Sequence, residues 1–137
     1  MRTFEDNFSD ALADIVYLSL EYCKKSVDKI FVHCLNDANC ISSNVFFMKN
    51  EIKQKRSEIP GITDSEQIKF VHEINSKIKD IKNLFTNNRQ PEPTEIKLIY
   101  EVSLKKLHTE LSYSESIMQN EEATVQDLFN LWFNSIS

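Results

Sequence analysis

The chain has 137 residues, of which 41% are hydrophobic, and its 21 acidic and 16 basic side chains give a formal net charge of −5 at pH 7. This length predicts a single domain over residues 1–137, and the hydrophobic content excludes a disordered chain. No apolar run approaches the ~20 residues of a membrane helix, and the acidic balance argues against a nucleic-acid partner because phosphate repels acidic side chains. The polar, acidic start of the chain and an odd number of cysteines without a CxxC pair favour the cytoplasm.

The first half of the chain predicts one helix followed by strands. Apolar residues recur at spacings of three and four over residues 3–26, which indicates an amphipathic helix. Two runs rich in β-branched and aromatic residues, 30–35 and 44–49, are typical of strands. A tight turn at Lys49-Asn50-Glu51 then allows residues 52–56 to form a polar edge strand, whose lysines discourage pairing with another sheet.

The most clearly marked helix of the sequence runs from Asp64 to Phe85. Pro60-Gly61 forms a turn before it, and Thr63 with Glu66 has the spacing of a capping box. We expect this helix to pack across a sheet that is built from the strands on either side of it. Its predicted apolar stripe consists of Ile68, Val71, Ile74, Ile78, Ile81 and Phe85.

The clearest hairpin follows this helix. Residues 96–102 and 107–113 each alternate apolar and polar side chains, which predicts two antiparallel strands with one buried face and one largely solvated face. We expect the long helix to lie on the face of Leu98, Tyr100 and Leu111. A further apolar stripe over residues 125–133 predicts a last short helix.

The element order α-β-β(-β)-α-β-β-α predicts an α+β fold, in which helices pack on one face of a mainly antiparallel sheet and leave the other face open. Phe46 and Phe47 are neighbours in a strand, so they point to opposite faces. One of them therefore lies on the open face. There it either contributes to a protein-binding patch or is covered by a further segment, for which residues 114–120 are a candidate.

The sequence contains no motif for catalysis or for cofactor binding. Gly61 is the only glycine, which excludes the glycine-rich loops that bring the backbone close to phosphate. The nearest approach to a metal site is His33, Cys34 and Cys40. These residues lack the close ligand pairs of structural zinc sites, and adjacent residues of a strand point to opposite faces. No local pattern supports a Cys–His nucleophile. We therefore expect a protein that is not an enzyme and that holds neither a metal nor a cofactor.

The distribution of charge points to a binding surface late in the chain. Residues 1–22 hold five acids and one arginine, and residues 107–137 hold five acids and no lysine or arginine. Acidic side chains alternate with the core positions of the hairpin and continue beyond it without a neutralising cation. Such acidity either keeps the chain soluble or suits a basic protein partner. The candidate partner-binding residues are Glu95, Glu101, His108, Glu110, Glu115, Glu121 and Glu122.

Three short runs carry a family resemblance. Ile59-Pro60-Gly61-Ile62-Thr63 precedes the long helix, Pro93-Thr94 precedes an alternating strand, and the last strand reads Lys105-Lys106-Leu107-His108-Thr109-Glu110-Leu111-Ser112-Tyr113-Ser114. In these runs and in the order of elements over residues 28–115, the chain resembles the YezG-like family of bacterial antitoxins. The resemblance implies a small immunity protein of a polymorphic or contact-dependent toxin system.

The function that follows is to bind and neutralise a cognate bacterial toxin by protein–protein association, without catalysis. Toxin nucleases must bind phosphate and are often basic, so a basic nuclease is the expected partner of an acidic inhibitor. The alternative function is that of a small acidic secretion chaperone, which binds an unfolded effector segment. The sequence leaves the oligomeric state open.

Overall fold

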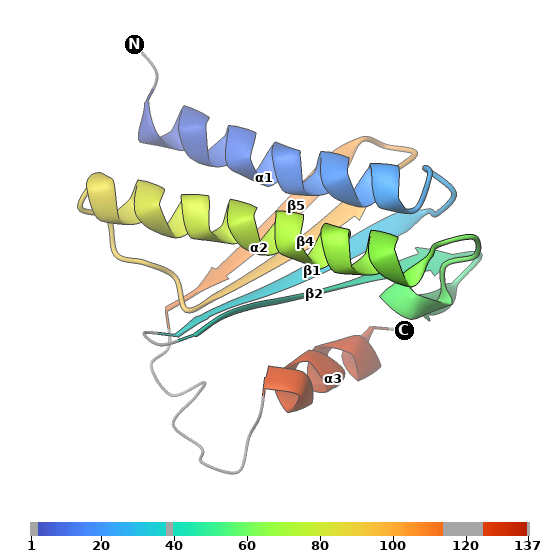
Figure 1. Ribbon diagram of the computed structural model, residues 1–137. Helices are drawn as coiled ribbons and strands as arrows, with labels where there is room; N and C mark the ends of the chain where they lie inside the picture. The colour runs from blue at the N-terminus through green and yellow to red at the C-terminus, as the bar shows by residue number, and fades with distance from the viewer. Residues whose placement is uncertain (1–2, 38–39, 114–124, 137) are drawn as a thin grey trace.

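Figure 1 shows the computed structural model of the chain, which describes residues 3–37, 40–113 and 125–136. The elements in chain order are α1 (Phe4–Tyr22), β1 (Lys29–Asp37), β2 (Cys40–Lys49), β3 (Ile52–Lys55), the 3-10 helix η1 (Arg56–Glu58), α2 (Asp64–Asn87), β4 (Glu95–Glu101), β5 (Lys106–Ser112) and α3 (Val125–Ser135). This succession confirms the predicted α+β fold.

The strands form one antiparallel sheet in the order β3-β2-β1-β4-β5, with β1 at the centre and β3 and β5 at the edges. The predicted turn between β2 and β3 is present. Asn50 and Glu51 both have positive φ angles, 52° and 66°, which a two-residue hairpin turn needs to follow the twist of its strands. The pairing of β1 with β4, which sets Val32 opposite Leu98, joins the two halves of the chain.

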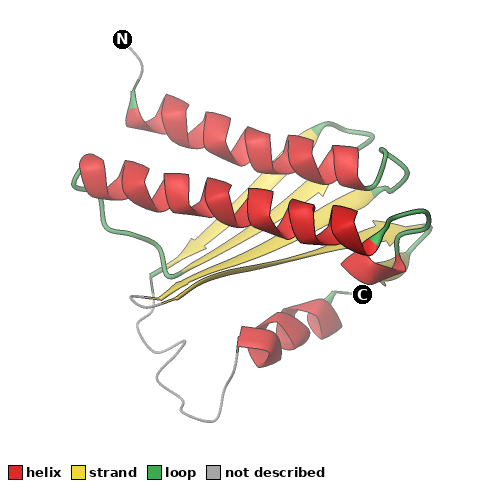
Figure 2. Cartoon of the chain, in the orientation of Figure 1, coloured by secondary structure: helices red, strands yellow, loops and turns green. Residues whose placement is uncertain are grey.

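The helices α1 and α2 lie side by side across one face of the sheet (Figures 1 and 2). Each begins at a threonine cap: the hydroxyl of Thr3 accepts the N–H of Asp6, and that of Thr63 accepts the N–H of Glu66, both at 3.1 Å. These bonds satisfy backbone donors that have no partner within the first helical turn. Within the described parts of the chain, no helix is both long enough and apolar enough to cross a membrane.

The start of α2 is rotated relative to the predicted stripe. Ile68 is 60% exposed and Val71 is half-buried, whereas Phe70, which the prediction omitted, is 5% exposed. The reason lies in the helical period, because a step of four back from Ile74 reaches Phe70. The Phe70 ring stacks on Tyr22 of α1 with 4.2 Å between ring centroids, and this contact fixes which face of α2 turns inward.

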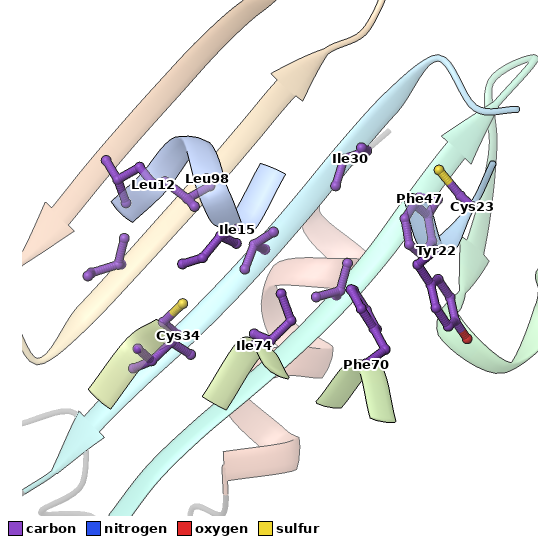
Figure 3. Close-up of a cluster of buried hydrophobic side chains, with 14 of the residues drawn as sticks. Leu12, Ile15, Tyr22, Cys23, Ile30, Cys34, Phe47, Phe70, Ile74 and Leu98 are labelled. Atoms are coloured by element: carbon purple, nitrogen blue, oxygen red, sulfur yellow. The ribbon is translucent and has the colours of Figure 1, made fainter. Parts of the chain in front are cut away.

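The main core fills the space between the two long helices and the sheet (Figure 3). α2 lies mainly against β2, and its second half reaches Ile96 of β4. It therefore occupies the predicted face, which it shares with Leu98, but it lies over β2 more than over the hairpin. The residues labelled in Figure 3 are Leu12, Ile15, Tyr22, Cys23, Ile30, Cys34, Phe47, Phe70, Ile74 and Leu98.

The third helix lies on the opposite face of the sheet (Figure 1). Trp132, 8% exposed, packs edge-on against Phe31 and Phe46, with ring centroids 5.9 and 5.3 Å away. This arrangement differs from the expectation of helices on one face only, because Phe46 points away from the main core and needs its own cover. Among the described residues α3 provides that cover; residues 114–120 lie outside them.

Lys53 of β3 fastens the end of α3 to the sheet. Its ammonium group donates hydrogen bonds to the carbonyls of Phe133 and Ile136, at 2.7 and 2.8 Å, and lies 4.6 Å from the centroid of the Phe133 ring. A cation at the C-terminal end of a helix stabilises carbonyls that have no partner within the helix. The lysine predicted to protect the sheet edge thus also anchors α3.

Candidate functional site

The candidate binding surface is the face of the β4–β5 hairpin that is turned away from α1 and α2, which we name the β4–β5 outer face; its Ile99 packs against the cluster that contains Trp132 of α3. The register places the predicted residues Glu95, Glu101, His108 and Glu110 together on this face, on the opposite side of the sheet from α1 and α2. It consists of Glu95, Lys97, Ile99 and Glu101 from β4 and Lys106, His108, Glu110 and Ser112 from β5.

The β4–β5 outer face carries charges of both signs rather than acids alone. Lys97 lies opposite Glu110, and Glu101 lies opposite Lys106, so two acids each face a cation across the strand pair. Opposite charges at such positions stabilise the pairing of strands. A partner would therefore meet alternating charges on a rigid sheet. Such a pattern fixes the orientation of the partner more than it adds net electrostatic attraction.

Glu95 is held in an internal pair with the buried imidazole of His33. His33 is 2% exposed, and its Nε2 donates to Glu95 Oε2 at 2.7 Å, while the Trp132 ring centroid lies 5.5 Å from that of the imidazole. The hydrogen bond from His33 lowers the pKa of Glu95 by more than burial raises it, and the nearby Lys97 ammonium acts in the same direction. Glu95 thus joins the β4–β5 outer face to the packing under α3.

This pair predicts a dependence of stability on pH. The pKa of Glu95 is lower in the folded chain than its ordinary value of 4.5, so its ionised form favours the fold. That contribution is complete above the ordinary value and is lost as pH falls through the folded-state pKa. Between about pH 6 and pH 3, the free energy of unfolding in urea should therefore fall less steeply in Glu95→Gln than in the parent.

Glu110→Gln is the matched control, since Glu110 is an exposed carboxylate on the same face. It should leave the acid-induced decline close to that of the parent. If the slope for Glu95→Gln also stayed unchanged, the pair with His33 would not contribute to stability.

The remaining predicted residues divide into two groups. Glu101 Oε2 accepts a hydrogen bond from His108 Nε2 at 3.0 Å, which is the largest cause lowering the pKa of Glu101; the two side chains are 25% and 47% exposed. They and the exposed Glu110 can reach a partner without rearrangement of the sheet. Glu115, Glu121 and Glu122 lie outside the described residues.

A second acidic surface, which the sequence interpretation did not assign to the site, follows the exposed side of α1. The helix carries five acidic side chains, all exposed, and no basic one. Lys77 of α2 approaches Asp14 at 3.4 Å. The excess of acidic residues in residues 1–22 was the feature of the sequence that could have indicated this surface. Their spacing along the helix places them on its solvent side. These acids are Glu5, Asp6, Asp10, Asp14 and Glu21.

The two cysteine side chains that the structure describes lie in the interior. Cys23 and Cys34 are buried free thiols; burial raises the pKa of both, that of Cys34 to about 12, which disfavours the reactive thiolate. Cys34 lies in the main core, whereas His33 faces Trp132 on the other side of the sheet. Among the side chains that the structure describes, no three of His, Cys, Asp or Glu are placed to hold a metal ion; the side chain of Cys40 lies outside them.

A hollow of about 460 Å³ lies beside the start of α2, between that helix and η1. It exposes Ile68 and is lined in part by Arg56, Asp64 and His72. The Nε of Arg56 is buried and has no hydrogen-bond partner among the described residues. This hollow is a concave, largely apolar surface with the Arg56 guanidinium beside it. It is formed by other elements than the predicted site on β4 and β5.

Two comparisons with known proteins bear on identity. No model of a known protein family matches the sequence, and a search of curated proteins found no significant relative.

Proposed function

We propose that this protein is a cytoplasmic immunity protein that binds a cognate bacterial toxin, a basic nuclease being the favoured class, and neutralises it by association without catalysis. The observation that carries the proposal is the β4–β5 outer face. It presents Glu101, His108 and Glu110 to solvent on paired strands whose other side is packed on the main core. Side chains on a rigid sheet recognise a folded partner with little loss of conformational entropy.

The charge of the chain supports a basic partner. The net charge is −5. The exposed side of α1 carries the acidic side chains of that helix, and α1 has no basic side chain. Opposite net charge accelerates encounter between two proteins, while charge pairs at the contact fix their orientation. In this proposal α1 contributes to long-range attraction, and the β4–β5 outer face makes the contact.

The test is a comparison of two double variants that change the net charge equally. Glu101→Lys with Glu110→Lys alters the β4–β5 outer face, and Glu5→Lys with Asp10→Lys alters α1. The partner is the purified protein encoded next to this chain. The first variant should slow association and speed dissociation. Where a carboxylate is buried against a partner cation, the binding free energy should be weakened by about 2–5 kcal/mol. The second variant should slow association only, and its association rate should depend less on salt concentration than that of the parent.

If the Glu101 and Glu110 variant folds and binds as tightly as the parent, the proposed contact surface is wrong. If the parent binds only an unfolded segment of the neighbouring product, the secretion-chaperone function replaces the immunity function.

A further inference from the structure

β5 is the less protected of the two sheet edges, since its one lysine, Lys106, stands at the first position of the strand. It is seven residues long, has no proline, and has no strand neighbour on its outer side among the described residues. The opposite edge, β3, has four residues, carries Lys53 and Lys55, and leads directly into η1. Short length and lysines discourage edge-to-edge pairing, so β3 is protected and β5 is available.

The backbone N–H and C=O groups of three residues of β5 point away from β4, toward the open side of the sheet. The carbonyl of Ser112 accepts the N–H of Thr94 at 2.8 Å, so it points toward the β4 side. Backbone groups along a strand point to alternate sides, which places those of His108 and Glu110 toward β4 as well. The N–H and C=O groups of Leu107, Thr109 and Leu111 therefore point outward.

The sequence of β5 is complementary to itself when it is read antiparallel about Thr109. On the side of α1 and α2, Leu107 would lie opposite Leu111 of a second copy, and Thr109 opposite its equivalent. On the β4–β5 outer face, His108 would lie opposite Glu110 of that copy. Apolar cross-strand pairs, and pairs that bring an imidazole to a carboxylate, stabilise a sheet.

Neighbouring registers are less favourable. A pairing centred on Glu110 would place two glutamates directly opposite each other, and like charges there destabilise the sheet. A pairing centred on His108 would place Leu107 opposite Thr109 and two imidazoles opposite each other. Only the register about Thr109 matches both faces of the strand and uses all seven residues.

We propose that two copies of this chain associate through β5 in the register centred on Thr109, so that their sheets join into one antiparallel sheet. The half-buried Leu107 and Leu111, which pack at the margin of the main core, become covered by their counterparts. The two β4–β5 outer faces become continuous across the junction. This association does not depend on the proposed function, since it requires no toxin.

The first test is sedimentation equilibrium of the purified chain alone. The parent should approach twice the chain mass of 16.0 kDa as its concentration rises about a hundred-fold. Thr109→Pro removes an outward N–H and leaves the ladder to β4 intact, because proline is tolerated at an edge. It should sediment as a folded monomer, whereas the control Thr109→Val, which keeps that N–H, should still dimerise.

A charge exchange tests the register itself and does not depend on proline. His108→Glu alone places acids opposite each other across the junction, and Glu110→Lys alone places a lysine opposite His108. Each should weaken self-association by at least about ten-fold. A mixture of the two variants places opposite charges together and should recover the dimer. A parent that stays at 16.0 kDa throughout, or variants that all dimerise like the parent, would overturn the proposal.

Discussion

Replacement of Trp132 by alanine is expected to lower the free energy of unfolding by about 3–5 kcal/mol. The indole is 8% exposed and fills the space over Phe31 and Phe46, and the Lys97 ammonium lies 5.7 Å from its ring centroid. Its removal leaves a cavity under α3 and also uncovers the His33 imidazole. Urea unfolding monitored by circular dichroism measures the change, since Trp132 is the only tryptophan and fluorescence would vanish with it.

The neighbouring residue provides the control. Leu131 is 69% exposed, so Leu131→Ala should change the free energy of unfolding by no more than about 0.5 kcal/mol. If both variants lowered the free energy of unfolding equally, α3 would not pack on the sheet through Trp132.

Replacement of Ile78 by aspartate should cost several kcal/mol, enough to unfold a domain of ordinary stability. Ile78 is 3% exposed on the inward side of α2, where it lies with Cys34, Phe85 and Ile96 around a small apolar gap. A carboxylate there would lose its hydration without gaining a cation among the described side chains that line the gap, apart from Lys82 at its margin. Thermal unfolding should show a strongly lowered midpoint or no cooperative transition.

Ile68→Asp is the matched control, because it introduces the same side chain on the same helix at a position that is 60% exposed. It should leave the midpoint within a few degrees of the parent. A folded Ile78→Asp protein with the stability of the parent would contradict the packing of α2 on the sheet.

The elements that the sequence predicted well are those with local signals. The alternation in β4 and β5, the threonine cap of α2 and the Lys49-Asn50-Glu51 turn are each encoded within a few residues, and all are present. The apolar stripe of α2 was right in its second half. Its start was misjudged because Ile68 was taken into the stripe in place of Phe70, which lies four residues before Ile74 and stacks on Tyr22.

The position of α3 and the pairing of His33 with Glu95 could not be predicted in the same way. The adjacent Phe46 and Phe47 indicated that one aromatic ring lies on the second face, but the sequence left open which ring it is and whether a segment covers it. His33 and Glu95 are 62 residues apart, and their contact depends on the register between β1 and β4. A glutamate that alternates with core positions looks solvated from sequence alone, whereas here a buried imidazole lies within reach.

The proposed immunity function is tested by the growth of cells that express the protein encoded next to this chain. This neighbour is expected to arrest growth when it is expressed alone. Co-expression of the parent should restore growth, and the two proteins should co-purify as a complex. The Glu101→Lys, Glu110→Lys variant should restore growth less well than the Glu5→Lys, Asp10→Lys variant. A neighbour that remains toxic in the presence of folded parent protein, with no complex formed, would contradict the proposed immunity function.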